Sequence, residues 1–144
     1  MQRRWDHWTA AWFVVCLALA THVVDEIWHG SYGLYEDAGR LLMLLFPALE
    51  LPPFQREVWF INLGGALLVL FALTWWVRVR GPLMTTASYL LAAFATANGV
   101  LHLLTVAALK NLVPGAWTAL LLIAAGLYLF VAIPRRNGAP AAGV

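Results

Sequence analysis

Four long apolar runs dominate the pattern of hydrophobic and polar positions along the chain. They cover about residues 8–29, 58–77, 83–109 and 114–134, and only the end of the first run carries charged side chains. A helix rises about 1.5 Å per residue, so about 20 apolar residues cross a hydrocarbon core about 30 Å thick. The pattern therefore predicts an all-α integral membrane protein, folded as a four-helix bundle with one span in each run.

The segments outside these runs are expected to lie at or beyond the membrane surface. The longest of them, 30–57, contains the apolar stretch 41–51, which is too short to span and is broken by Pro47. We expect this stretch to be an interfacial or re-entrant segment of the first extracytoplasmic loop. The tail 137–144 reads NGAPAAGV and is expected to be disordered. Residues 1–136 then form a single transmembrane domain.

The composition supports a membrane protein, and the basic residues predict its orientation. Hydrophobic residues make up 62% of the chain and charged residues 11%, against about 25% charged in an ordinary soluble domain. The net charge of +2 gives no reason to expect a nucleic-acid partner. Six of the nine basic residues flank the same ends of the four runs: Arg3, Arg4, Arg78, Arg80, Arg135 and Arg136. The positive-inside rule therefore places both termini in the cytoplasm, and we expect a multi-pass protein of the inner (plasma) membrane.

The first run also has features of a secretory signal peptide. Two arginines precede it, and Ala18-Leu19-Ala20 imitates an A-x-A cleavage site. Against cleavage, the apolar run continues past Ala20. Cleavage would also leave three spans with the termini on opposite sides of the membrane. We therefore expect the first run to remain as a span.

Small and aromatic residues predict how the helices pack and where they meet the membrane surface. Small residues are expected at helix–helix contacts, namely Gly64-Gly65, Ala92-Ala93, Gly99 and Ala124-Ala125-Gly126. Most aromatic residues near the ends of the runs are expected to anchor the interface: Trp5, Trp8, Trp28, Tyr32, Trp59, Trp75, Trp76 and Trp117.

The end of the first run carries four ionisable side chains within eight residues: His22, Asp25, Glu26 and His29. At about 100° per residue, these four positions fall on one helical stripe. A charged group near the centre of a membrane helix costs about 2.5–3.5 kcal/mol on insertion scales, so such residues are usually paired or functional. Two imidazoles and two carboxylates form a set that binds metal ions or moves protons.

Polar residues of the other three runs are predicted to lie at the same depth. Counting along helices that run outward puts His22 about 21 Å, Asn98 about 18 Å and His102 about 24 Å above the cytoplasmic ends of their spans. Asn62 and Thr118 come soon after the outer ends of the two spans that run inward. Because Asn98 and His102 are four residues apart, they share a helix face. We therefore predict one polar site in the outer half of the bilayer.

Three short motifs in the chain resemble those of a known family. In chain order they are His22-x-x-Asp25-Glu26, Asn98-x-x-x-His102 and Pro114-Gly115-x-x-Thr118. They are similar to the HxxEE, NxxxH and YxPGxxT motifs of the HXXEE-domain family of small bacterial integral membrane proteins, over about residues 10–130. Asp25 stands where the family has its first Glu, and Leu112 stands where it has Tyr. The resemblance implies a site on these motifs but leaves the reaction open, because the family is described as of unknown function.

The polar set favours an intramembrane enzyme that moves protons on a lipophilic small molecule. His22 and Glu26 would form the acid–base pair, and Asp25 would orient an imidazole. His102 would be a second proton carrier, and Asn98 would donate to a developing oxyanion. Isomerisation, cyclisation or hydrolysis of a lipid-like substrate would suit these groups. Supporting or substrate-contacting roles are expected for Asn62, Pro114, Gly115 and Thr118.

A second version of the enzyme hypothesis adds a metal ion. His22, Glu26 and His102 could supply three nitrogen and oxygen ligands and leave a position open for water, as catalytic zinc sites do. His29 is a less favoured ligand because it is expected closer to water. The ligand set suits zinc or iron, and catalysis without a metal stays equally open.

Non-enzymatic functions stay open as well. A transport accessory subunit or a lipid- or ion-binding protein would also use intramembrane ionisable residues. Against a transport path, the chain has no inverted repeat and the inner halves of its runs lack ionisable side chains, although a homo-oligomer could supply missing elements. A purely structural polar cluster is the remaining alternative. Interhelical hydrogen bonds in membranes contribute only about 0.6 kcal/mol on average, which poorly explains two adjacent carboxylates.

Overall fold

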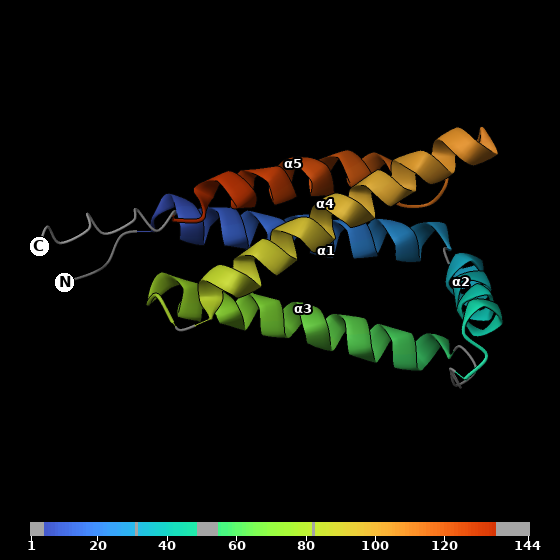
Figure 1. The fold of residues 1–144 in the computed structure, drawn as a ribbon, viewed down its shortest axis with the longest axis horizontal. Coiled ribbons are helices and arrows are strands. Elements are labelled where there is room, and N and C mark those ends of the chain that lie inside the picture. Colours follow the sequence, from blue (N-terminus) through green and yellow to red (C-terminus); the bar gives the residue numbers. More distant parts are fainter. Residues whose placement is uncertain (1–4, 31, 49–54, 82, 135–144) are drawn as a thin grey trace, which may run out of the picture.

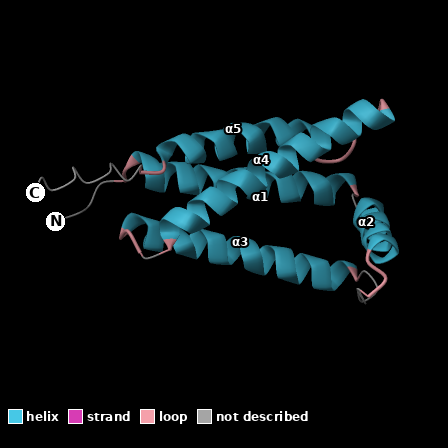
Figure 2. Ribbon diagram, in the orientation of Figure 1, coloured by secondary structure: helices cyan, strands magenta, loops and turns pink. Residues whose placement is uncertain are grey.

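The computed structural model describes residues 5–30, 32–48, 55–81 and 83–134, and within them every regular element is a helix. The five helices are α1 (His7–His29), α2 (Tyr32–Leu45), α3 (Arg56–Arg78), α4 (Met84–Leu109) and α5 (Ala116–Ala132) (Figure 1, Figure 2). The tail 137–144, for which disorder is predicted, lies outside the described residues, as does the end of the predicted interfacial stretch, 49–51.

The long helices begin and end within two residues of the four apolar runs of the sequence. Three of them, α1, α3 and α4, are long and apolar enough to cross a membrane. The fourth, α5, is apolar but has only 17 residues and is therefore about 25 Å long. The protein is thus an all-helical membrane protein with three candidate spans and one shorter apolar helix among the described residues.

Helix α1 holds the other long helices together. It contacts α3, α4 and α5, while the most extensive helix–helix contact is between α4 and α5. Helices α1 and α4 run in one direction, and α3 and α5 run in the other (Figure 1). The short helix α2 lies across the end of this group, next to the end of α1 (Figure 1). The carboxyl end of α1 and the amino end of α5 therefore lie toward the same end of the molecule.

Both ends of α1 are capped, so the polar stretch at its carboxyl end stays helical. Asp6 is the N-cap residue and accepts a hydrogen bond from the backbone N–H of Thr9 at 2.8 Å. Arg80, in the turn before α4, donates to the same carboxylate. Partial burial opposes ionisation of Asp6, but the Thr9 bond and Arg80 together hold its pKa below the ordinary value. At the other end, Gly30 adopts a left-handed conformation (φ 74°) and its N–H bonds back to the last turn.

The first half of α1 is fixed by two buried tryptophans. Trp8 is 4% exposed, and its indole N–H donates to the Ser88 hydroxyl of α4 at 2.9 Å. Trp12 is 1% exposed and donates to the Leu70 carbonyl of α3 at 3.0 Å. The expectation that Trp8 anchors the membrane interface is therefore wrong. An indole buries a large apolar area and needs one acceptor, and α4 provides both the space and the oxygen.

Close packing of α4 on α5 depends on two glycines. A Cβ added to Gly99 would lie 2.5 Å from the Ala119 carbonyl oxygen, and one added to Gly126 would lie 2.3 Å from the Thr96 hydroxyl. These two small-residue contacts occur as predicted. In contrast, a Cβ on Gly64 or Gly65 would meet nothing within 4 Å. The prediction that this pair in α3 packs against a helix is therefore wrong for the described residues.

Candidate functional site

Three ionisable side chains from two helices converge beside α5. His22 and Glu26 lie one turn apart on α1, and His102 faces them from α4. Glu26 Oε1 lies 3.6 Å from His22 Nε2 and 3.3 Å from His102 Nε2. The two imidazole rings meet edge to face, with centroids 4.6 Å apart. The side chains of His22, Glu26 and His102 are only 2%, 5% and 13% exposed, so this histidine–glutamate cluster is almost completely removed from water.

Thr118, in the first turn of α5, joins His22 to Asp25. Its hydroxyl oxygen lies 2.8 Å from His22 Nδ1, and it donates to Asp25 Oδ2 at 2.8 Å, with the Gly115 carbonyl as a second acceptor at 3.1 Å. Both the carboxylate and the carbonyl only accept hydrogen bonds, so the single hydroxyl proton points to one of them. The oxygen then accepts from His22, which assigns the proton of that ring to Nδ1 and leaves Nε2 with a lone pair.

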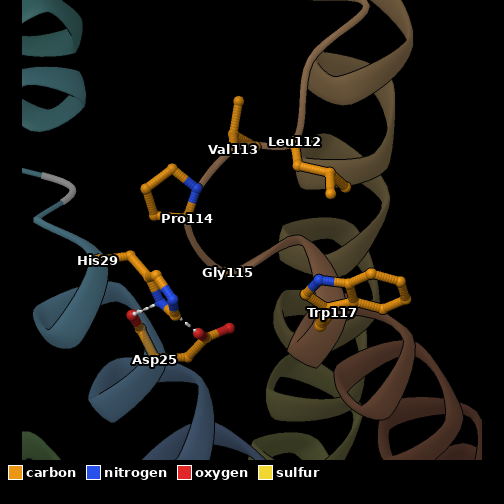
Figure 3. Close-up of a pocket in the computed structure, with 7 residues that line it drawn as sticks. All are labelled: Asp25, His29, Leu112, Val113, Pro114, Gly115 and Trp117. Carbon is orange, nitrogen blue, oxygen red and sulfur yellow. Dashed lines mark hydrogen bonds and ion pairs between the residues drawn. The ribbon is translucent and has the colours of Figure 1, made fainter.

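His29 continues this chain of polar groups to the surface. Its Nδ1 lies 2.8 Å from Asp25 Oδ1, and its side chain is 56% exposed while that of Asp25 is 15% exposed. Figure 3 shows the two side chains side by side at the end of α1. Within the described residues, a connected path therefore runs from exposed His29 through Asp25 and Thr118 to buried His22.

A pocket of about 420 Å³ opens over this path. Asp25 and His29 form its polar side, and the chain before and at the start of α5 forms the remainder (Figure 3). The lining residues of this second side are Leu112, Val113, Pro114, Gly115 and Trp117. The pocket thus offers one wall with a carboxylate and an imidazole and one wall that is mainly apolar, an arrangement that suits a molecule with a polar group on an apolar body.

Gly115 separates this pocket from the histidine–glutamate cluster. A Cβ added to it would lie 2.7 Å from His22 Cε1 and 2.9 Å from His102 Cε1. Its backbone is left-handed (φ 82°), a conformation that glycine adopts without strain. The sequence predicts that Pro114-Gly115 marks the outer end of a span. Gly115 instead contacts two histidines that each lie seven residues before the last residue of their helices, His29 and Leu109, or about 10 Å inside the helix ends.

Most of the chain, including the residues of this site, matches a known protein family. The model of a family described as "Protein of unknown function with HXXEE motif" matches residues 12–129 of the chain. The chain belongs to the HXXEE family. Comparison with curated proteins and with solved structures gives no match. The predicted family is therefore confirmed, and the matched range of the HXXEE domain includes His22, Glu26, His102 and Thr118.

Two asparagines predicted for the HXXEE site are not brought to it. Asn98 is partly exposed on α4, one turn before His102, and makes no hydrogen bond to the described site residues. Asn62 is exposed on α3, whose buried residues, Thr74 and Val77, lie near its other end. Helix α3 therefore contributes nothing to the histidine–glutamate cluster among the described residues.

The structure divides the four ionisable residues near the carboxyl end of α1 into two groups. His22 and Glu26 join His102, and ligand atoms of these three residues all lie within 4.8 Å of one another, so they could hold a metal ion. Asp25 and His29 face the pocket instead. The sequence does not predict three residues that also line the pocket, Leu112, Val113 and Trp117, as site residues. Their proximity in sequence to Pro114-Gly115 is the one signal that could have suggested them.

Proposed function

We propose that this HXXEE protein is an intramembrane enzyme that acts on a lipophilic molecule in the outer half of the inner (plasma) membrane. The observation that carries this proposal is the buried contact of His22 Nε2 and His102 Nε2 with the Glu26 carboxylate, one glycine away from a pocket. Burial of a carboxylate and two imidazoles in one cluster is costly in a membrane protein. A reaction that uses their protons or lone pairs accounts for that cost.

The topology that we propose has four spans and cytoplasmic termini. The ends of α1 and α3 that carry Asp6, Arg78 and Arg80 then face the cytoplasm, and α2 lies on the outer surface. Helix α5 is short because it begins beside His22 and His102 rather than at the outer surface. Its 17 residues reach from the level of the site to the cytoplasmic side.

This topology puts irregular backbone inside the membrane. The segment from Lys110 to Gly115 returns from the end of α4 to the level of the histidines (Figure 1). Non-helical backbone at membrane depth occurs where it is buried in protein or lines a cavity, because its polar groups need partners. Here it lines the pocket. We infer that the pocket is hydrated and brings the substrate and water to Asp25 and His29, with only Gly115 between them and the histidine–glutamate cluster.

The residues of the cluster would share the chemistry as follows. His22 is held by Thr118 with the Nε2 lone pair directed at the cluster, so it is the base. Glu26 holds or releases the proton that passes between the two imidazoles, and His102 is the second carrier. Asp25 acts through Thr118 to fix the His22 ring. Hydrolysis and isomerisation both fit this arrangement.

The activity is tested on the lipids of the cells that express the protein. Purified protein in detergent is incubated with a total lipid extract of these cells, and the products are compared by mass spectrometry. We expect the wild type to convert one lipid class, and Glu26→Gln and His102→Ala to lose at least about 100-fold of that activity. The matched control is Thr105→Val, because among the described residues the Thr105 hydroxyl bonds only to the Leu101 carbonyl of its own helix.

A melting experiment on the same variants separates the enzyme from a structural cluster. Breaking a buried ion pair that holds a fold together costs about 3–5 kcal/mol. Leu122→Ala, at a fully buried core position, provides the scale for such a loss, about 2–5 kcal/mol. If the cluster is catalytic rather than structural, we expect Glu26→Gln to melt at or above the temperature of the wild type, with both proteins treated with a chelator. An unchanged lipid profile in Glu26→Gln, or melting of both site variants as low as Leu122→Ala, would reject the proposal.

A further inference from the structure

One buried nitrogen of the histidine–glutamate cluster, His22 Nε2, has no hydrogen-bond partner among the described residues. His22 as a whole is 1% exposed. The Nδ1 proton goes to Thr118, so Nε2 is an acceptor. It faces Glu26 Oε1, another acceptor, at 3.6 Å. Two acceptors that face each other in a buried site are repulsive unless a cation or a proton lies between them.

We propose that His22, Glu26 and His102 bind one divalent transition-metal ion of the zinc class. This inference rests on the proposed function and names a cofactor for the same site, although the ligand geometry that supports it is independent of any reaction. With the ion bound, the Nε2 lone pairs of His22 and His102 would be metal ligands, so the acid–base roles given above would apply to the metal-free site. His22 and His102 would bind through Nε2, and Glu26 through its carboxylate.

The separations of the ligand atoms match tetrahedral coordination. With metal–nitrogen and metal–oxygen bonds of about 2.0–2.2 Å, two ligands at the tetrahedral angle lie about 3.3–3.6 Å apart. The two nitrogen–oxygen separations are 3.6 Å and 3.3 Å. Ligand atoms of all three residues lie within 4.8 Å of one another, so the third separation exceeds the tetrahedral value by at most about 1.5 Å.

The surroundings of the cluster also fit a metal ligand set. A metal-bound histidine usually donates its other ring N–H to an oxygen, which fixes the tautomer and the ring orientation. The Thr118 hydroxyl oxygen accepts that bond from His22, and the hydroxyl donates its own proton to the Asp25 carboxylate. Because Gly115 has no side chain, the rings of both histidines can lie close to its backbone, and any larger residue would press on their Cε1 atoms. Thus Thr118 and Gly115 position the ligands, and neither binds the metal.

The donor set selects the class of ion. Two imidazole nitrogens and one carboxylate oxygen suit zinc and its first-row neighbours. Calcium and magnesium require shells of oxygen ligands, which this cluster does not provide. Three protein ligands leave a coordination position for water or substrate, as in catalytic zinc sites. Asp25 and His29 line the pocket and do not contribute to the metal shell.

The test measures metal binding directly. The full chain is purified in detergent through a tag without histidines, treated with a chelator, and titrated with Zn²⁺ alone while bound zinc is counted by elemental analysis. Co²⁺ then replaces zinc, because its visible spectrum reports tetrahedral coordination. We expect one zinc per chain and a tetrahedral Co²⁺ spectrum. The variants His22→Ala, Glu26→Gln and His102→Ala should each weaken binding at least about 100-fold.

One further variant controls for general damage, and a second tests the support of a metal ligand. His29→Ala removes an exposed imidazole two turns from His22 and should still bind one zinc. Thr118→Val should weaken zinc about 10–100-fold without changing the stoichiometry, since it removes only the support of a ligand. A wild type that binds less than about a tenth of an equivalent at micromolar zinc, or variants that bind as well as the wild type, overturns the metal site. Metal bound without lipid turnover would reject the proposed function and leave the metal site standing, whereas turnover by metal-free wild type would reject the metal as the cofactor of the reaction and leave the acid–base enzyme.

Discussion

At the scale of single residues, Gly115 explains why two histidines on different helices can meet. The rings of His22 and His102 occupy the space where a Cβ of this residue would lie, and the pocket begins on its other side. The left-handed backbone at φ 82° also turns the chain into α5, so Thr118 reaches His22 and Asp25. One residue without a side chain therefore sets both the close contact and the start of the helix.

Gly115→Ala is expected to destabilise the protein. Backbone strain at a left-handed position costs about 1–3 kcal/mol, and the contacts at 2.7 Å and 2.9 Å would push both imidazoles away. Thermal unfolding in detergent measures the change. Gly64→Ala is the matched control, because Gly64 lies in α3 with nothing within 4 Å, and it should be neutral or gain up to about 1 kcal/mol. Equal melting temperatures for the two variants would contradict this account of Gly115.

At the scale of elements, α1 carries the site near its carboxyl end while its amino end is anchored by side chains. Trp8 and Trp12 hydrogen-bond to α4 and α3, and Asp6 caps the helix and pairs with Arg80. These contacts set the rotation of α1 about its axis. Because rotation is fixed along the whole helix, the stripe of His22 and Glu26 is directed at α4 and α5 rather than at lipid.

Asp6→Ala should lower the free energy of unfolding by about 1 kcal/mol through loss of the N-cap bond to Thr9. Asp6→Asn keeps a capping oxygen and loses only the pair with Arg80. The folded-state pKa of Asp6 is lowered from 3.8, so its charge stabilises the fold above that pH and the contribution disappears as pH falls through the lowered value. Tryptophan fluorescence during heating, at neutral pH and at about pH 3, measures the thermal stability of the wild type and of both variants. A gap between wild type and Asp6→Asn that widens on acidification would contradict the assignment.

At the scale of the whole molecule, the proposed orientation puts the polar cluster and the basic ends on opposite sides of the bilayer. In this orientation the histidine–glutamate cluster, which lies near the carboxyl ends of α1 and α4, would be in the outer half of the bilayer. The turn between α3 and α4 carries Arg80 on the other side. A site in one leaflet suits a membrane-dissolved substrate and gives no path through both leaflets.

Reporter fusions test this orientation. Fusions at Gly81 and at Gly138 should both report the cytoplasm, and a fusion at Pro47 should report the outer side, because basic residues flank the cytoplasmic ends. An outer-side signal at Gly138 with a cytoplasmic signal at Gly81 would mean that α5 does not span. Reversed signals at all three positions would overturn the orientation and would move the site to the inner leaflet.

The sequence by itself determined the four long helices and the matching positions of His22 and His102 along two of them, but it did not predict α2. Length and apolarity specify the helices, and a rise of about 1.5 Å per residue converts position into depth. Counted in this way, His22 and His102 lie at similar heights, about 21 Å and 24 Å along their spans. The order of the short motifs also led to the HXXEE family.

Only the tertiary structure decided which residues at that level meet. Depth says nothing about the direction in which a helix turns its side chains, since that depends on how the helices pack. Close packing at Gly99 and Gly126 and the indole bonds of α1 set these rotations. His102 was thereby turned toward Glu26, while Asn98 and Asn62 were left outside the cluster. Likewise, Gly115 lies deep in the molecule because the two imidazoles leave room for a residue without a side chain, a contact that composition and periodicity do not encode.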